Sequence, residues 1–263
     1  MGELEAALRA ARDRGRKLLV PYVTGGLGDE WTDVLRAVAA AGADAIEIGI
    51  PFSDPVMDGG VIQTASRLAL EAGATPANVL ETIAEAAIDV PVLVMTYLNP
   101  VLAHGEETFL REVVEAGVSG VIVPDLPVDE ASGWIEACSD TDVAPVFLAA
   151  PGTSDARLRD IAAASRGFVY CVSTMGVTGS RQELSRSAEA VVGGLRPLTD
   201  TPLLVGVGIS TPAQATAACA FADGVVVGSA LVEPMLAGDR DETLTRARTF
   251  GAALAFAAAG DQE

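Results

Sequence analysis

The sequence predicts an α/β fold in which one (β/α)8 TIM barrel, with a parallel eight-stranded core, takes up the whole chain. Short β-branched runs alternate with Ala-rich segments of helical spacing from one end to the other. The strand runs are apolar almost throughout, as in parallel sheets covered on both faces. The 263 residues suit one such barrel, and no linker or low-complexity tract divides them. We therefore expect residues 1–263 to form a single barrel domain.

Eight strands are expected, each followed by a helical segment. In chain order they are residues 18–24, 43–50, 90–97, 120–124, 143–149, 167–172, 202–207 and 224–227. Helical spacing is shown by Val34, Ala37, Val38 and Ala41, and again by Phe109, Val113 and Val114. An open doubly wound sheet is the alternative. Its G-x-G-x-x-G fingerprint is missing after the first strand, where Gly25, Gly26 and Gly28 stand.

Charge and composition exclude several classes of protein. The formal net charge of -19 disfavours binding to nucleic acid or to anionic membranes, which need clustered Lys and Arg. Cys138, Cys171 and Cys219 have no short spacing, so they fit a reducing compartment and neither a disulfide framework nor a zinc site. The N-terminus has no apolar signal core, and the longest weakly polar run, residues 250–260, is too short to span a bilayer. We expect a soluble cytoplasmic protein.

Glu47 is the acid that the second strand should carry into the barrel. Three isoleucines, Ile46, Ile48 and Ile50, alternate with Ala45, Glu47 and Gly49. Because side chains alternate across a strand, isoleucines that face the helices leave Glu47 pointing inward. Burial of an ionised acid is costly, so its pKa should rise toward the range that a general acid or base requires. The alternative is an ion pair with a neighbouring strand. No Lys or Arg lies in the expected strands, although Lys17 flanks the first.

Two aspartates occupy the loop that follows this strand. Pro51 and Pro55 stiffen the loop around Asp54 and Asp58. An isolated loop aspartate is usually a turn former or a helix cap, and we favour that interpretation for Asp54. For Asp58 the structural and the functional interpretations both remain open.

The scarcity of Lys and His also constrains the chemistry. A Schiff-base aldolase needs a strand lysine, and Lys17, the only lysine, stands at the entrance of the first strand. A metal-dependent aldolase needs several His ligands, and His104 is the only histidine; we expect it to be a solvated loop residue. Acid–base chemistry by carboxylates, with no metal in this chain, remains.

Two glycine turns late in the chain predict a phosphate site. Gly206 and Gly208 end the seventh strand before a helix that opens at residues 210–212, and Gly228 and Ser229 end the eighth. The loops after these two strands are the usual phosphate site of such barrels, because glycines and helix N-termini present backbone N–H groups. A third glycine loop, residues 173–179, is long for its position. It is either a mobile lid or an ordinary flexible loop.

Six segments carry a resemblance to a known family. They are "PFSDPVMDG", "TYLNPV", "VPDLPVDE", "STMGVTG", "GVGIS" and "VVVGSALV", and the similarity around them runs over about residues 18–236. In order and approximate spacing they resemble the tryptophan synthase alpha family. Two departures stand out: Thr174-Met175 replaces a common Arg-Ser in the lid, and "TGGLGDE" at Thr24 replaces the commoner "TxGDP".

The resemblance implies an activity and a set of residues. The activity is retro-aldol cleavage of indole-3-glycerol phosphate to indole and glyceraldehyde 3-phosphate in L-tryptophan biosynthesis. By the resemblance, Glu47 and Asp58 match the catalytic carboxylates, Tyr170 a tyrosine beside them, and Thr178 a lid threonine that hydrogen-bonds the aspartate. The phosphate contacts that the family pattern implies are Gly179, Gly208, Gly228 and Ser229. No cofactor is implied in this chain, since pyridoxal phosphate belongs to a partner beta subunit in an α2β2 heterotetramer.

Other functions were compared with this one. Indole-glycerol-phosphate synthase relatives use a strand lysine as the acid, and this chain has none. Sugar-phosphate isomerases of histidine synthesis pair two strand-end aspartates, whereas here a strand glutamate pairs with a loop aspartate. A non-catalytic subunit that only activates a partner is a further alternative. The partner should dock on the strand-end rim formed by residues 51–58, 97–100 and 124–127, which are apolar and rich in proline. The alternative is that these segments pack against the barrel's own helices.

Overall fold

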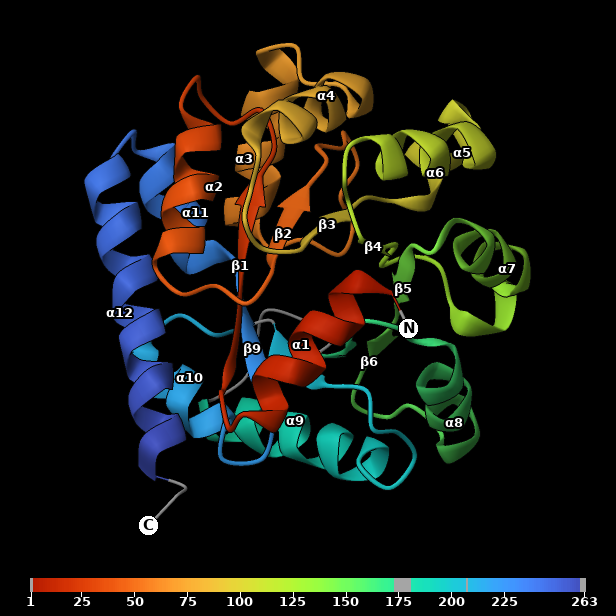
Figure 1. Ribbon diagram of the computed structural model, residues 1–263, viewed down its shortest axis with the longest axis vertical. Coiled ribbons are helices and arrows are strands. Elements are labelled where there is room, and N and C mark those ends of the chain that lie inside the picture. Colours follow the sequence, from red (N-terminus) through yellow and green to blue (C-terminus); the bar gives the residue numbers. More distant parts are fainter. Residues whose placement is uncertain (1, 173–180, 207, 261–263) are drawn as a thin grey trace.

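The computed structural model describes residues 2–172, 181–206 and 208–260. Strands alternate with helices along the chain, and the helices surround the sheet (Figure 1). The strands are β1 (Leu18–Thr24), β2 (Ile46–Gly49), β3 (Val92–Met95), β4 (Gly120–Ile122), β5 (Ala144–Val146), β6 (Leu148–Ala149), β7 (Val169–Val172), β8 (Leu203–Gly206) and β9 (Gly224–Val227). The helices are α1 (Glu3–Asp13), α2 (Trp31–Ala40), α3 (Gly60–Glu71), α4 (Pro76–Ala86), α5 (Leu98–His104), α6 (Glu106–Glu115), the 3-10 helix η1 (Val128–Glu130), α7 (Ser132–Thr141), α8 (Asp155–Ala164), α9 (Arg181–Leu195), α10 (Pro212–Ala218), α11 (Ser229–Leu236) and α12 (Arg240–Gly260).

The sheet closes at the fifth expected strand, which the hydrogen bonds divide in two. The strand order is β5-β4-β3-β2-β1-β9-β8-β7-β6, and every neighbouring pair is parallel. β5 and β6 stand at the two ends of this order, yet only Phe147 separates them in the chain. The Phe147 carbonyl accepts a hydrogen bond from the Tyr170 N–H at 3.0 Å. The expected eight-stranded parallel barrel is therefore confirmed, with its fifth strand serving both edges. The seventh strand was expected to reach Val207, which lies outside the described residues.

Alternating side chains divide the core into an inner and an outer layer. The inner layer, inside the barrel, includes Leu18, Val20, Ala45, Leu93, Ile122, Leu204 and Val226. The outer layer, between the strands and the helices, includes Ile46, Ile48 and Ile50 packed with residues of α2 and α4. The prediction that the isoleucines face outward and Ala45 and Glu47 inward is thus confirmed.

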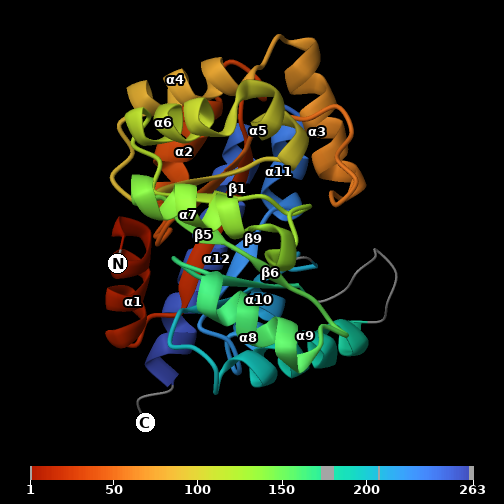
Figure 2. The ribbon, with the colours of Figure 1, turned by 90° about the vertical axis from the view of Figure 1, so that its right-hand side faces the viewer.

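Helix α1 closes the end of the barrel at which the strands begin. Its Leu4 and Leu8 are completely buried in the inner layer. Gly120 and Gly167 make room for it, since a Cβ on either glycine would lie 2.6 Å from Cδ2 of Leu4. Figure 2 shows α1 at one edge of the molecule and α3, which follows the end of β2, at the other.

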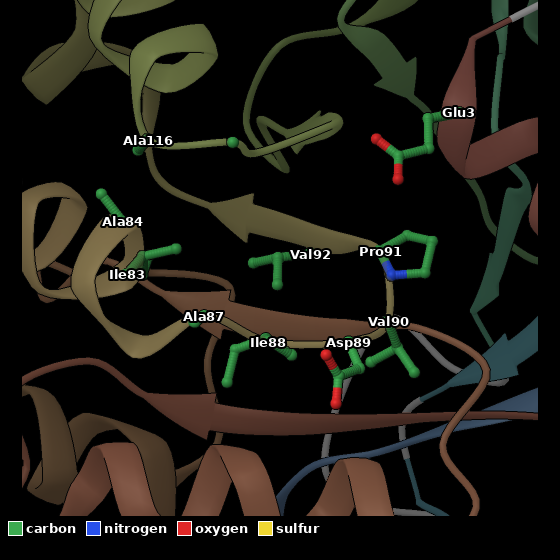
Figure 3. Close-up of a pocket in the computed structure, with 11 residues that line it drawn as sticks. Glu3, Ile83, Ala84, Ala87, Ile88, Asp89, Val90, Pro91, Val92 and Ala116 are labelled. Atoms are coloured by element: carbon green, nitrogen blue, oxygen red, sulfur yellow. The ribbon is translucent and has the colours of Figure 1, made fainter.

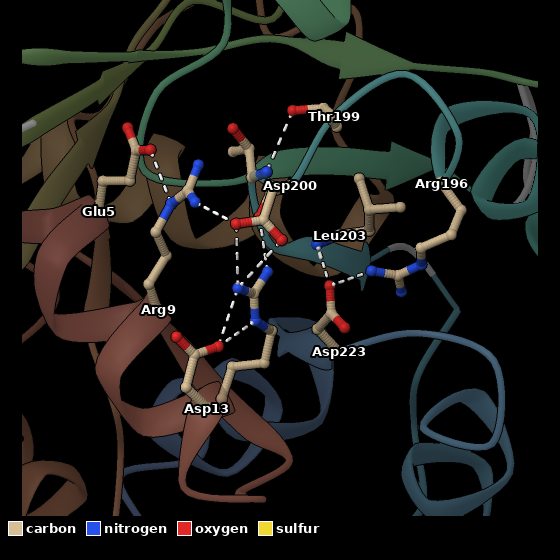
Figure 4. Close-up of polar contacts among 10 residues, drawn as sticks. Glu5, Arg9, Asp13, Arg196, Thr199, Asp200, Leu203 and Asp223 are labelled. Atoms are coloured by element: carbon tan, nitrogen blue, oxygen red, sulfur yellow. Dashed lines mark hydrogen bonds and ion pairs between the residues drawn. The ribbon is translucent and has the colours of Figure 1, made fainter.

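Two arginines fasten α1 to the loop before β8 (Figure 4). Arg9 bridges Glu5, with Nε 2.8 Å from Oε1, and Asp200. Arg12 donates from Nη1 to the Asp200 carbonyl at 2.5 Å. Each such partly exposed ion pair contributes only about 0–1 kcal/mol, so burial of Leu4 and Leu8 supplies most of the stability of this contact.

No helix in the described ranges is long and apolar enough to cross a membrane.

Candidate active site

Glu47 lies in the middle of β2 and points into the barrel. Its side chain is 1 % exposed, and its Oε2 has no hydrogen-bond partner among the described residues. Burial, and next the nearby charge of Asp58, raises the pKa of Glu47 to about 8. The ion pair weighed from the sequence is not formed within the described part of the chain. The carboxyl group therefore stays protonated at neutral pH and is available to give up a proton.

Asp58 is brought to the same place by the loop that follows β2. The Asp58 N–H donates to the Pro55 carbonyl at 3.2 Å, and the Met57 N–H donates to the Tyr97 hydroxyl at 3.0 Å. The ring of Phe52 stacks on Tyr97, with centroids 5.1 Å apart. Burial raises the pKa of Asp58 to about 6, against a hydrogen bond from Tyr97 that lowers it. Of the two open interpretations, this environment favours the functional one.

The two carboxyl groups form an unequal pair. Each is shifted mainly by burial, but Asp58 keeps a hydrogen bond to its charged form and Glu47 does not. Between pH about 6 and about 8, Glu47 is protonated and Asp58 is ionised. A buried acid beside a half-buried anion is an arrangement that can protonate a substrate and stabilise the resulting positive charge.

Two tyrosines line the site, each fitted over a glycine of the next strand. A Cβ on Gly49 would lie 1.9 Å from the Tyr22 hydroxyl oxygen, and one on Gly206 would lie 2.3 Å from that of Tyr170. Glu47 and Asp58 are the charges that act on the Tyr170 phenol, whose pKa burial raises well above its ordinary value. The family pattern predicted Tyr170, whereas Tyr22 and Tyr97 were not predicted from the sequence. An inward tyrosine beside a strand that ends in glycine was the available signal for Tyr22.

The other two residues weighed from the sequence lie apart from this pair. Asp54 is exposed and accepts a hydrogen bond from the Ser53 hydroxyl at 2.6 Å, in keeping with a turn former. The expectation of a solvated loop position for His104 is wrong, because this half-buried residue ends helix α5. Its Nε2 lies 2.8 Å from Oε2 of Glu112, and its ring meets Phe109 edge-on. Gly105, with a φ of +89°, ends helix α5 directly after His104, so His104 is the last residue of the helix and not part of a loop.

The expected phosphate loops differ in how many donors they leave available. Gly228 is the N-cap of α11 and offers no side chain, so the first N–H groups of that helix lack a side-chain cap. At α10, by contrast, Gln214 and Thr211 form a capping box, and Oε1 of Gln214 also accepts from the Ser210 N–H at 2.8 Å. Gly208 has a φ of +88°. The start of α11 thus leaves more backbone N–H groups without a side-chain partner than the start of α10 does. Thr178 and Gly179 lie outside the described residues.

The rim around the strand ends exposes several apolar side chains. Val56 is 78 % exposed and Met57 49 %. Asn99 and Pro127 are exposed as well. Packing against the barrel itself accounts only for part of the rim, including Tyr97 and Leu126, which are buried.

A pocket of about 260 Å³ lies at the opposite end of the barrel (Figure 3). Asp89 and Pro91, just before β3, line it together with Glu3 of α1 and apolar side chains such as Ile88 and Val90. It lies where the strands begin, whereas Glu47 lies within β2 and Asp58 in the loop that follows it, so we do not assign the catalytic chemistry to this pocket. Among the described residues, no group of three or more His, Cys, Asp or Glu is placed to hold a metal ion.

Comparisons with known proteins point to one family. The family model for the tryptophan synthase alpha chain matches residues 8–257. The tryptophan synthase alpha chain of Streptomyces coelicolor is 47 % identical over 242 residues, which cover 89 % of this chain and 88 % of the relative. That of Synechocystis is 42 % identical, covering 95 % and 97 %. A structure of Mycobacterium tuberculosis tryptophan synthase superposes with a TM-score of 0.89 at 36 % identity, covering 96 % of this chain and 98 % of that one.

Proposed function

The chain belongs to the tryptophan synthase alpha chain family, lyases of tryptophan biosynthesis that cleave indole-3-glycerol phosphate, and we propose that Glu47 and Asp58 carry out that cleavage here. The observation that carries this assignment is the enclosed pair itself. One carboxyl group is fully buried with an unpartnered oxygen, and a second, ionised one lies close enough to raise its pKa. We further propose that residues 1–263 act as one catalytic domain.

The chemistry requires one proton to be added and another to be removed. Protonated Glu47 delivers its proton to the indole ring carbon that bears the glycerol chain, which leaves the positive charge on the ring nitrogen. Asp58 accepts a hydrogen bond from the indole N–H and offsets this charge. The Glu47 carboxylate then takes the proton of the adjacent chain hydroxyl. The carbon–carbon bond breaks, its electron pair returns to the ring, and indole and glyceraldehyde 3-phosphate leave.

One experiment tests this function directly. The purified chain is incubated with indole-3-glycerol phosphate, and the release of indole is followed with time. Indole release that Glu47→Gln abolishes supports the catalytic assignment. If the chain alone, and the chain with its cognate beta subunit, both release none, the alternative of a non-catalytic activating subunit is preferred.

Phosphate binding at the start of α11 is expected to be sensitive to Gly228. A Cβ there meets nothing closer than 3.7 Å, so the fold has room for the Gly228→Val side chain, which would cover the helix N–H groups. We expect a higher KM for indole-3-glycerol phosphate and little change with indole glycerol, which lacks the phosphate. Steady-state kinetics with both substrates measure this. Equal losses with both would mean that Gly228 serves packing alone.

Gly208→Val makes a useful comparison for that experiment. Because Gly208 has a positive φ, any side chain there strains the backbone, so a lower Tm should accompany the raised KM.

We assign Ser229, Gly208 and Gly179 to the phosphate, and Thr178 to a hydrogen bond with Asp58. For Thr178 and Gly179 the family pattern is the support, since both lie outside the described residues.

The partner that we propose is a tryptophan synthase beta subunit, docked on the strand-end rim in an α2β2 heterotetramer. The exposed apolar side chains of Val56 and Met57 support this, because such patches often mark interfaces. Pyridoxal phosphate would be held by that partner, and this chain would need no cofactor. We place the assembly in the cytoplasm.

Asn99→Lys is expected to weaken this complex and to reduce the acceleration of indole formation by the beta subunit. The exposed Asn99 lies on the rim, where a lysine would have to be desolvated on docking. Co-sedimentation and the rate with and without partner measure the effect, and Pro127→Glu should act in the same direction. Ala84→Lys is the matched control, since it adds the same charge on an exposed site of α4, beside the pocket at the opposite end. Equal affinities for Asn99→Lys and Ala84→Lys would contradict docking on the rim.

A further inference from the structure

Tyr22 connects the two halves of the site. Its side chain is 5 % exposed and begins on β1 beside Gly228, whose Cβ position lies 3.7 Å from Cβ of Tyr22. The hydroxyl end reaches the inward face of β2 at Gly49, whose Cβ position lies 1.9 Å from the phenol oxygen and 2.5 Å from Cζ. One tyrosine therefore extends from the glycine that caps α11 to the strand that carries Glu47.

The position of the hydroxyl relative to Glu47 follows from strand register. Tyr22 pairs with Glu47 between β1 and β2, and Gly49 lies two residues further along on the same face. The Tyr22 hydroxyl is thus held on the side of Glu47 toward the strand end, where Asp58 follows. Burial, and next the charge of Asp58, raises the pKa of Tyr22 well above its ordinary value. The phenol stays protonated and can donate a hydrogen bond throughout the working pH range.

Most other side chains around Tyr22 are apolar, but the Thr24 side chain hydrogen-bonds the Tyr22 hydroxyl oxygen. Leu27, Ile62 and Val232 pack in the same cluster, together with Ala65. A phenylalanine could fill the apolar part of this cluster equally well, so packing explains the ring and the glycine at position 49 but not the hydroxyl. Thr24 meets the oxygen of this buried hydroxyl, which leaves the phenol proton for a second polar partner.

The substrate offers such a partner at the corresponding place. In indole-3-glycerol phosphate a three-carbon chain joins the ring to the phosphate. The hydroxyl next to the ring is the one that Glu47 deprotonates, and the middle hydroxyl lies between it and the phosphate. A donor held between Gly228 and Glu47 lies alongside that middle carbon.

We propose that the Tyr22 hydroxyl hydrogen-bonds the middle hydroxyl of the glycerol chain and so selects phosphorylated aldehydes and indole adducts that carry it. The proposal rests on the function proposed above, since it assumes that phosphate binds at α11 and that the reacting carbon lies at Glu47. Tyr22 then acts as a specificity-determining contact, separate from the proton transfers.

The test uses the reaction in the direction of condensation, with two aldehydes. Indole is combined with glyceraldehyde 3-phosphate or with 3-oxopropyl phosphate, which lacks the middle hydroxyl, and kcat/KM is measured for the wild type and Tyr22→Phe. A neutral hydrogen bond contributes about 0.5–1.5 kcal/mol, so the variant should lose roughly 2- to 13-fold with glyceraldehyde 3-phosphate. With 3-oxopropyl phosphate it should match the wild type. Equal losses with both aldehydes, or no loss with either, would overturn the proposal.

Two controls separate this contact from other roles of a tyrosine. Tyr97→Phe removes a hydroxyl that holds the Asp58 loop, so it should reduce turnover of both aldehydes alike. The pH profile of Tyr22→Phe should keep the wild-type shape, and a displaced limb would mean that the hydroxyl acts on the carboxyl groups instead. Glu47→Gln should lose both condensations. If it retains them, the function proposed above fails, whichever way the two aldehydes compare in Tyr22→Phe.

Discussion

Glu47→Gln is expected to lower the rate of indole release by ~10²–10⁴-fold, the usual loss when a general acid–base is removed. Glutamine fills the same space on β2 but can neither give nor take the proton. Glu47 is 1 % exposed, so bulk water is excluded from replacing it. Steady-state assays across pH measure the effect. In the wild type, activity should fall as pH rises through about 8, where Glu47 loses its proton. A variant that kept more than about a tenth of the activity would contradict the assignment.

Thermal unfolding distinguishes a catalytic loss from a folding defect in this variant. The pKa of Glu47 rises from 4.5 to about 8 on folding, so the folded protein holds this proton more tightly than the unfolded chain. The resulting stabilisation is complete below pH about 4.5 and is lost as pH rises through about 8. Glutamine does not titrate. The Tm of Glu47→Gln minus the Tm of the wild type should therefore be larger at pH 9 than at low pH.

Asp58→Asn is expected to reduce turnover by about 10²–10³-fold, as loss of an electrostatic contact to a developing charge does. The amide oxygen can still accept the indole N–H, so KM should change little. Asp58 works ionised and its pKa is about 6, so wild-type activity should fall as pH drops through that value. The variant has no carboxyl group there and should lack this acidic limb. The measurement is kcat and KM between pH 5 and 9, and turnover like that of the wild type would return Asp58 to a turn-forming role.

Strand alternation in the sequence was enough to place Glu47. Three isoleucines facing outward left one acid facing inward, and the absence of strand cations predicted its raised pKa. The eight strand runs likewise predicted the barrel. Their ends were less predictable: the structure divides residues 143–149 at Phe147, because one strand must pair with β4 at its start and with β7 at its end.

Contacts between distant residues set the remainder of the site. The environment of Asp58 depends on the Tyr97 hydroxyl, 40 residues along from the Met57 N–H that it accepts. The difference between the two phosphate loops depends on the side chain of Gln214, which occupies donors that glycine spacing alone leaves open. From the sequence, His104 was expected in a loop. Its position as the last residue of helix α5 depends on the backbone conformation of Gly105, which the sequence pattern does not reveal.

The way in which α1 closes the barrel has a consequence for biosynthesis. This helix is synthesised before the strands that it covers, yet Arg9 is bound to a residue 191 positions later, and Leu4 fills space beside Gly120 and Gly167. During translation its apolar face has no partner until most of the chain has been made, at roughly 5–20 residues per second. The end of the barrel at which the strands begin therefore cannot be closed until the late strands have been made. A segment made before the strands is thus among the last to dock, and Leu4 and Leu8 stay open to aggregation or chaperones for about 10–40 s.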